Sequence, residues 1–365
     1  MRIAYVSLHW PRTRNSGVGK KIQSQLAAWN ALGHEVRLFM HTSEYEPQSD
    51  LIDADYFFYK AGGKARTELN RIEAMTKMIR AVGEFRPDLI YLRYSIYVFP
   101  AHRLMKIAPV VEEINTNDLA QHEQLGLIYS LYNRFTRGIF LRHIQGLVAV
   151  SRELAISPAF ASYRKPIVVI ANGIDLNAFQ PLPAPINEKP RLFFIATPGY
   201  PWHGVDKLMT LARTCPDLTL DIVGYDERDG LGELPRNVHL HGYMNLDAYE
   251  RVLREADIAL STLALHRKDM DEACPLKTRE CLAYGLPMVL AYEDTDLADL
   301  DSDFLLRIPN RDDNIETHAA RIREFAYAMR GQRVDRHLIG ERIDSKPKEK
   351  KRLAFFEQVV QDLKG

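Results

Sequence analysis

The sequence predicts an α/β protein of two domains, each with a parallel sheet covered by helices on both faces. Short runs rich in β-branched and aromatic residues alternate with helix-like segments along the whole 365-residue chain, which is typical of parallel sheets. That length is sufficient for more than one domain. Near the middle, PLPAPINEKP (181–190) contains four prolines in ten residues and suits a stiff linker.

The predicted elements follow one another in a regular order. β-rich runs lie at 2–8, 35–40, 88–93, 109–114, 147–151 and 167–171 in the first half, and at 191–197, 218–224, 237–242, 257–261, 287–291 and 304–308 in the second. Helical patterns lie between them at 66–85, 119–144, 204–213, 245–255 and 276–284. A last helix should place Leu353, Phe356 and Val359 on one face. Such sheets bind ligands at the carboxyl ends of their strands, and two of them would form a ligand cleft.

Composition and charge narrow the classes of partner. The hydrophobic share of 46% and the charged share of 26% are ordinary for a soluble enzyme. The net charge is zero, but residues 1–150 carry 19 Lys and Arg against 14 Asp and Glu, and the remainder carries 29 against 34. A mildly basic N-terminal half suits a phosphate-bearing partner or an anionic membrane surface. The excess is too small to indicate nucleic acid and no recognition motif for it is present, so no nucleic-acid partner is expected.

The cysteines and the N-terminus predict the compartment. Cys215, Cys274 and Cys281 are odd in number and lack metal-site spacing, so reduced thiols in a cytoplasm are expected. The opening MRIAYVSLHW is too soon interrupted for a signal peptide, and no apolar stretch reaches spanning length. We expect a cytoplasmic protein and leave open a peripheral position at the inner face of the membrane. The basic and apolar residues of 66–86 could touch a membrane, but a solvated amphipathic helix explains them better. The sequence does not decide the oligomeric state.

The stretch NSGVGKK (15–21) follows the first predicted strand and looks like a phosphate-binding loop. It is not a P-loop, because Arg14 stands where the first glycine belongs and Lys21 where the hydroxyl belongs. It is not a dinucleotide fingerprint, because Ile22 replaces the third glycine and no acid ends the next strand. What remains is a flexible turn into a helix, which could offer free amides to an anion or simply pack helix on strand.

The most informative stretch is DEACPLKTRECLAYGLPMVLAY (271–292), in which seven residues separate Glu272 from Glu280. Pro275 suits the first turn of a helix and Gly285 suits its end, so a helix is predicted between them. The amides at its start could bind a diphosphate, and the two carboxylates could accept hydrogen bonds from sugar and ribose hydroxyls. A surface helix with ordinary glutamates explains the same spacing.

Glu-x7-Glu followed by CLAYGLP resembles the donor-site signature of retaining GT-B glycosyltransferases of the family 4 type. Further motifs stand in the family's order along nearly the whole chain: GHEV (33–36), VAVSREL (148–154), VIANGIDLNAF (169–179), LDIVG (220–224), NVHLHGYM (237–244) and ADIALS (256–261). The resemblance implies two Rossmann-like domains with parallel sheets facing a central cleft. We therefore expect an acceptor-binding domain over 1–180, a linker over 181–190, a nucleotide-sugar-binding domain over 191–345, and a terminal helix over 346–365 that crosses back to pack on the first domain.

The resemblance also implies roles for particular residues. Glu272 would act as a catalytic residue at the hydroxyls of the transferred sugar, and Glu280 would bind the ribose. The diphosphate would meet the backbone of Ala273, Cys274, Pro275, Leu276 and Lys277. Further donor contacts are expected from Gly199, His203, Tyr243, Met244, Gly17 and Gly19. No metal is implied, and no cofactor besides a UDP- or GDP-linked sugar as co-substrate, because amides and cationic side chains can stabilise the leaving group.

Two departures from the family pattern are present. The family has an Arg and a Lys on the first loop of the second domain, but TPGYPWHGVDK (197–207) has His203 at the Lys position and no arginine. Protonated His203, Lys207 or Lys277 could replace them at the diphosphate. Many members have a His after the fourth strand, where this chain has Asn115. Asn115 is our second catalytic candidate, although it can hydrogen-bond a sugar hydroxyl and cannot take a proton.

The predicted function is transfer of a hexose, with retention, from a UDP- or GDP-sugar to a glycan or lipid-linked acceptor, as in cell-envelope polysaccharide synthesis. Two alternatives stay open. One is a GT-B sugar-nucleotide epimerase or phosphorylase, and the other is a sugar-nucleotide binder that has lost turnover with its Arg/Lys pair. The sequence does not identify the base, the sugar, the acceptor or the linkage.

Overall fold

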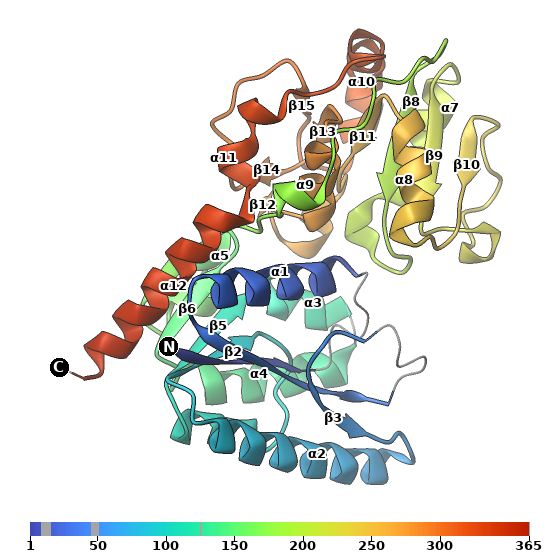
Figure 1. Cartoon of the computed structure of the whole chain (residues 1–365). Helices are drawn as coiled ribbons and strands as arrows, with labels where there is room; N and C mark the ends of the chain where they lie inside the picture. Colours follow the sequence, from blue (N-terminus) through green and yellow to red (C-terminus); the bar gives the residue numbers. More distant parts are fainter. Residues whose placement is uncertain (9–15, 45–50, 125, 365) are drawn as a thin grey trace. The chain divides into compact units, whose positions relative to one another are not determined.

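Two compact units make up the chain in the computed structural model, which describes residues 1–8, 16–44, 51–124 and 126–364 (Figure 1). The first unit is Met1–Ala171 together with Ser345–Gly365, and the second unit is Asn172–Asp344. The boundary between them falls earlier in the chain than the proline-rich segment 181–190, which belongs to the second unit.

The first unit is built on a seven-stranded parallel sheet with the order β3-β2-β1-β4-β5-β6-β7. The strands are β1 (Arg2–Leu8), β2 (Glu35–Ser43), β3 (Asp55–Tyr59), β4 (Leu89–Arg93), β5 (Val110–Ile114), β6 (Gly146–Ala149) and β7 (Ile167–Val169). All six strands predicted for this half are present. The seventh, β3, was not predicted; it lies at the sheet edge, where its residues are only half-buried and give a weak apolar pattern.

Helices cover both faces of this sheet. They are α1 (Gly17–Ala31), α2 (Lys64–Phe85), α3 (Asp118–Gln124), α4 (Leu127–Leu141), α5 (Arg152–Ile156), α6 (Pro158–Ala161) and α12 (Ser345–Asp362). The single helix predicted over 119–144 was wrong. Gly126 separates α3 from α4 because its φ of 109° lies in the left-handed region, which ends a helix and favours glycine.

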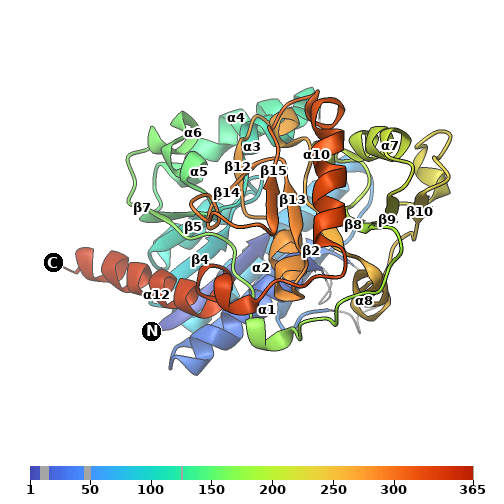
Figure 2. The ribbon, with the colours of Figure 1, turned by 90° about the horizontal axis from the view of Figure 1, so that it is seen from above.

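The helix α12 packs beside α1, as Figure 1 and Figure 2 show. Leu353, Phe356 and Val359 are buried in the core of the first unit, on the face that the sequence predicted. The Trp29 ring of α1 meets Phe356 edge to face at 5.5 Å, and Trp29 Nε1 donates to Glu349 Oε2 of α12 at 2.8 Å. Apolar burial and a buried hydrogen bond therefore hold α12 on this unit.

The second unit contains a six-stranded parallel sheet with the order β10-β9-β8-β11-β13-β15 and a two-stranded sheet, β12-β14. Its strands are β8 (Arg191–Ile195), β9 (Thr219–Val223), β10 (Val238–Leu240), β11 (Ile258–Leu260), β12 (Glu272–Ala273), β13 (Met288–Leu290), β14 (Glu293–Asp294) and β15 (Leu305–Arg307). The six strands predicted for this half all lie in the larger sheet. The two-residue strands β12 and β14 were not predicted.

The main helices of the second unit are α7 (Val205–Thr214), α8 (Leu246–Glu255), α9 (Leu276–Ala283), α10 (Asn314–Met329) and α11 (Gly340–Ile343). The first three of these match the predicted helices within two residues. α7 and α10 pack together in one apolar core with the sheet. No helix among the described residues is both long and apolar enough to span a membrane.

Candidate functional site

The loops at the carboxyl edge of the second unit's large sheet are held close together. Gly224 follows β9 with a φ of 98°, and a Cβ there would lie 1.9 Å from the carbonyl oxygen of Ala196, which follows β8. Only glycine can occupy this position without a clash. Gly224 N also donates to Gly242 O at 2.7 Å, which ties the turn after β10 to the same edge. Ligands of open parallel sheets bind at this edge.

Hydrogen bonds fix the loop after β8 against the segment after β11. Leu263 N donates to His203 O and Ala264 N donates to Trp202 O, both at 3.2 Å. His203 is therefore held by its own backbone, although the family's Lys is missing from this position. Gly199 lies earlier in the same loop, with a φ of 86°.

The helix predicted between Pro275 and Gly285 is confirmed as α9. Pro275 is its N-cap residue and makes no side-chain cap, so the amides of Leu276 and Lys277 have no acceptor within the helix. Asn172 fixes Cys274, the residue before Pro275. The backbone N–H of Asn172 donates to Cys274 Sγ at 3.2 Å, and its side-chain Nδ2 donates to Cys274 O at 2.9 Å. Asn172 belongs to the VIANGIDLNAF motif, whose part in placing α9 the sequence did not reveal.

Buried polar contacts anchor α9 to the sheets. The hydroxyls of Ser261, Thr278 and Tyr292 form a triangle with sides of 2.8 to 2.9 Å. Arg279 is fully buried and makes two bonds to Asp294, at 2.7 and 2.8 Å. These contacts fix the start of α9 before any ligand binds, which is what preorganised electrostatic stabilisation requires.

The two predicted glutamates lie on different elements. Glu272 is in β12, which pairs with β14, and only 7% of its surface is exposed. Glu280 is inside α9, and its carboxylate accepts a hydrogen bond from the Tyr249 hydroxyl of α8. Burial and the adjacent Glu280 raise the pKa of Tyr249, so its proton remains on the hydroxyl and orients the carboxylate.

Two lysines lie around His203. Lys277 Nζ is 3.5 Å from His203 Nδ1 and 3.2 Å from Ile195 O, and Lys268 Nζ lies 4.4 Å from the centre of the Trp202 ring. Neither lysine forms an ion pair in the part of the chain that the structure describes. Burial lowers the pKa of Lys277 to about 7 and that of Lys268 to about 8.

His203 is neutral in this setting. Burial and the charges of Lys277 and Lys268 lower its pKa to about 2, so the protonated form considered from the sequence is not favoured in the ligand-free chain. When Lys277 is protonated, its ammonium can only donate, so His203 Nδ1 then accepts from Lys277 and Nε2 carries the hydrogen.

Lys207 is engaged away from this group. Its ammonium donates to Arg311 O at 2.7 Å, Asp312 O at 2.8 Å and Asn314 Oδ1 at 2.9 Å. Three bonds at the start of α10 give this lysine a structural role. Three residues were considered from the sequence as substitutes for the family's Arg/Lys pair. His203 and Lys277 lie together, whereas Lys207 is bonded elsewhere.

The turn after β10 carries the residues predicted beside the base. Gly242 N donates to Tyr225 O at 2.8 Å, which fixes the turn. Tyr243 is 87% exposed, and Met244 is half-buried. An aromatic ring this exposed is available for stacking, and its contact with a base stays a prediction.

The predicted residues of the first unit lie at the carboxyl edge of that unit's own sheet. Gly17 and Gly19 form the first turn of α1, where Ser16 Oγ accepts from Gly19 N at 3.0 Å. Asn115 follows β5, and its Oδ1 accepts from Lys21 Nζ at 3.4 Å. Contacts of these residues with a donor or an acceptor stay predictions.

Lys21 is committed to a buried ion pair. Its Nζ lies 2.7 Å from Glu113 Oε1, to which Arg93 Nη1 also donates at 3.1 Å. Burial would raise the pKa of Glu113, but Lys21, Arg352 and Arg93 outweigh it and hold that pKa well below its usual range. Lys21 therefore neutralises a core carboxylate.

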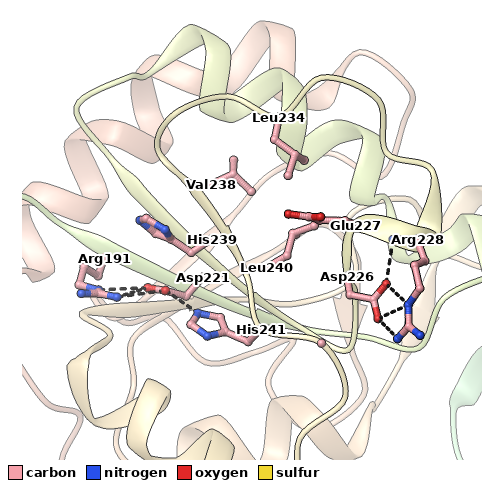
Figure 3. A pocket seen from close by; sticks show the side chains of 11 residues that line it. Arg191, Asp221, Asp226, Glu227, Arg228, Leu234, Val238, His239, Leu240 and His241 are labelled. Atoms are coloured by element: carbon pink, nitrogen blue, oxygen red, sulfur yellow. Dashed lines mark hydrogen bonds and ion pairs between the residues drawn. The ribbon is translucent and has the colours of Figure 1, made fainter.

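A separate cavity of about 960 Å³ lies at the β10 edge of the second unit (Figure 3). Figure 3 shows Asp221 between Arg191 and His241, with Asp221 bonded to Arg191 at 3.0 Å and to His241 at 2.8 Å. Gly242, from the turn predicted to lie beside the base, lines this cavity, and the other donor residues predicted from the sequence do not. Because Arg191, Asp221 and His241 bond to one another and Asp226 pairs with Arg228, we assign the cavity no ligand.

Metal ions and thiolates would use the His, Cys, Asp and Glu side chains of the described ranges. Within them, no group of three or more His, Cys, Asp or Glu is placed to hold a metal ion. Cys215, Cys274 and Cys281 are buried thiols. Burial raises the pKa of the Cys274 thiol to about 11, so this residue contributes its backbone and bulk to the site and not a thiolate.

The sequence missed Lys268 and Tyr249. Both are drawn to the site by folding: Lys268 comes from the segment after β11, and Tyr249 from α8. The only available signal for Lys268 was its position shortly after the ADIALS motif, which ends a strand of the sheet. No local pattern pointed to Tyr249.

Two Rossmann-like sets of parallel strands, joined in one chain, are typical of the GT-B fold, and comparison with solved structures agrees. The chain is similar to a sucrose-phosphate synthase from Thermosynechococcus elongatus, with a TM-score of 0.69 and 15% identity over 99% of each chain. It is also similar to an α-glucosyltransferase in complex with UDP-glucose and DNA containing an abasic site, with a TM-score of 0.65 and 15% identity over 99% of each chain. A third similar structure is Anabaena HepE in complex with UDP, with a TM-score of 0.61 and 15% identity over 98% of this chain and 100% of that one.

A family match covers part of the chain. Residues 15–178 match the model of Glycosyltransferase Family 4. No curated protein matches the chain. With the fold, this match confirms the resemblance found in the motifs: residues 15–178 match Glycosyltransferase Family 4, and the two units have the fold of the GT-B glycosyltransferases to which the chain is similar.

Proposed function

We propose that this chain is a retaining glycosyltransferase that moves a hexose from a UDP- or GDP-sugar to a glycan or lipid-linked acceptor without using a metal ion. The observation that carries the proposal is the lysine pair, Lys277 and Lys268, beside the start of α9. Neither has a carboxylate partner within the described residues, and an unpaired desolvated cation is costly. A diphosphate would supply the missing anion.

The same pair would replace the Arg and Lys that the family carries on the loop after β8. Lys277 and Lys268 would neutralise the diphosphate from two elements. His203, as the tautomer with hydrogen on Nε2, would act as a neutral donor to a phosphate oxygen. The free amides of Leu276 and Lys277 would complete the cradle.

The carboxylates would hold the two sugars of the donor. Glu280, oriented by Tyr249, would accept hydrogen bonds from the ribose hydroxyls. Glu272, fixed on β12, would accept from the hydroxyls of the transferred hexose. With the phosphates gripped between them, these contacts would place the anomeric carbon reproducibly.

In the reaction, the bond between the anomeric carbon and the phosphate oxygen breaks, and negative charge grows on the departing diphosphate. The lysines and the α9 amides stabilise that charge, which is where a metal-independent transferase needs its cations. The departing phosphate takes the proton of the acceptor hydroxyl as the new bond forms on the same face. Asn115 would hydrogen-bond a hydroxyl without exchanging protons.

UDP is the nucleotide we favour. Anabaena HepE was solved with UDP and the α-glucosyltransferase with UDP-glucose, and both share this fold.

A thermal-shift screen with UDP, GDP and their sugars tests donor binding, because a ligand at about 100 times its Kd stabilises the fold by about 2.7 kcal/mol. Glu272→Ala should abolish transfer with an unchanged fold, whereas the exposed control Glu233→Ala should stay active. Full activity in Glu272→Ala would refute the assignment. Conversion of the nucleotide sugar without acceptor would indicate an epimerase, and binding without transfer or hydrolysis would indicate a binder.

A further inference from the structure

Large apolar side chains lie exposed on the first turns of α4. The exposed fraction is 74% for Leu127, 81% for Ile128 and 82% for Phe135. The cluster, which we call the α4 patch, consists of Leu127, Ile128, Tyr129, Leu131, Tyr132 and Phe135, each more than 40% exposed. Contiguous exposed apolar residues on a folded protein mark an interaction surface.

Polar contacts force this patch outward. The inner face of the same helix buries Ser130, Asn133 and Arg137. Arg137 makes a two-pronged ion pair with the buried Asp118, at 2.8 and 2.9 Å, and Asn133 Nδ2 donates to Asp118 at 2.6 Å. The rotation of α4 about its axis is thus fixed by strong charge-assisted bonds, and its apolar residues cannot turn inward.

The charge around the α4 patch is basic. The helix itself contains no acidic residue. A series of hydrogen bonds links the patch to a basic segment: Tyr132 of the patch donates to Tyr97 O at 3.1 Å, and the Tyr97 hydroxyl bonds His102. The exposed residues Arg103 and Lys106 follow His102 in this segment.

The neighbouring acids are neutralised, and the whole unit is basic. Glu123 pairs with Arg134, and Glu68 pairs with Arg71. The first unit carries 28 Lys and Arg against 18 Asp and Glu, whereas the second unit carries 20 against 30. A partner of the α4 patch is therefore expected to be apolar and negatively charged.

We propose that the α4 patch docks on the surface of an anionic lipid bilayer. Leucine, isoleucine, phenylalanine and tyrosine side chains would enter the boundary between headgroups and acyl chains, and Arg103 and Lys106 would face lipid phosphates. A second copy of the chain fits less well, because a symmetric contact through this patch would bring two basic units together. The contact is interfacial, and it is independent of the donor that the enzyme uses.

Cosedimentation of the full-length protein with vesicles tests this proposal. Binding should be stronger to phosphatidylglycerol-containing vesicles than to phosphatidylcholine alone, and it should weaken with added salt. Ile128→Asp and Phe135→Asp should each lower vesicle affinity at least tenfold. Ile156→Asp is the matched control, because Ile156 is 76% exposed on α5 and lies outside the α4 patch.

Thermal unfolding of all three variants shows whether they are folded, which exposed substitutions should preserve. The proposal is overturned if the wild type does not bind anionic vesicles, or if both α4 variants bind like the wild type. It is equally overturned if sedimentation velocity shows an oligomer that the α4 variants dissociate, or if the wild type binds duplex DNA and no vesicles.

Discussion

The affinity of the chain for its nucleoside diphosphate should fall as the pH rises through neutrality. Burial lowers the pKa of Lys277 to about 7 in the empty site, so much of this lysine is uncharged above neutral pH. A bound diphosphate would restore an ordinary lysine pKa, near 10.4, and binding above pH 7 would then require proton uptake. For these two values, affinity drops roughly 90-fold between about pH 6 and pH 9, which is about 2.7 kcal/mol.

Isothermal titration calorimetry with UDP across this pH range measures the effect. The terminal phosphate of UDP gains charge above about pH 6, which would strengthen binding, so the ligand's own titration cannot imitate the predicted loss. Lys277→Met should weaken binding at low pH and flatten most of the pH dependence. The same substitution at the exposed Lys189 should change neither. Wild-type affinity that stays constant from low to high pH would refute the role given to Lys277.

Three further predictions concern stability. Burial and the neighbouring Asp118 raise the pKa of Glu112 to about 8. The stability that the protonated Glu112 gives the fold is therefore present below its unfolded pKa and is lost as the pH rises through 8. Glu112→Gln should raise the Tm at pH 9 and leave it nearly unchanged at pH 5. Arg279→Met leaves Asp294 buried without its cation and should lower the free energy of unfolding by about 3–5 kcal/mol in urea, where a loss below about 1 kcal/mol would contradict the ion-pair argument. Gly224→Ala places a Cβ against Ala196 O and should cost at least about 3 kcal/mol, whereas Gly230→Ala, with open space around it, should cost less despite its own positive φ.

Features that depend on local patterns were predictable from the sequence. The alternation of apolar runs and helical patterns gave all six predicted strands of each large sheet, because buried parallel strands need continuous apolar runs. The bounds of α9 followed from Pro275 and Gly285, since both residues act through their own backbone. Leu353 and Phe356 marked the buried face of α12 because their spacing follows the helical period.

Features that depend on long-range contacts were not predictable. The sequence predicted a helix over 119–144 without indicating its buried face, and in the structure Asn133 and Arg137 bind Asp118 and turn the apolar face of α4 outward. His203 was weighed as a cation, but burial and two lysines that fold beside it lower its pKa to about 2. Neither outcome has a periodic signal, because each depends on which distant residues fold around the side chain.

The lysine arrangement gives the missing Arg/Lys pair a physical meaning. A family member with arginine at this site keeps full positive charge at any working pH, because arginine does not lose its proton. Lys277 and Lys268 can lose theirs, since burial lowers both pKa values. The empty site can therefore relieve its unpaired charge by releasing protons, and a diphosphate must draw them back. Replacing the family's Arg/Lys pair by Lys277 and Lys268 should therefore keep the phosphate contacts possible but make donor binding sensitive to pH. A site with arginine would not show this sensitivity.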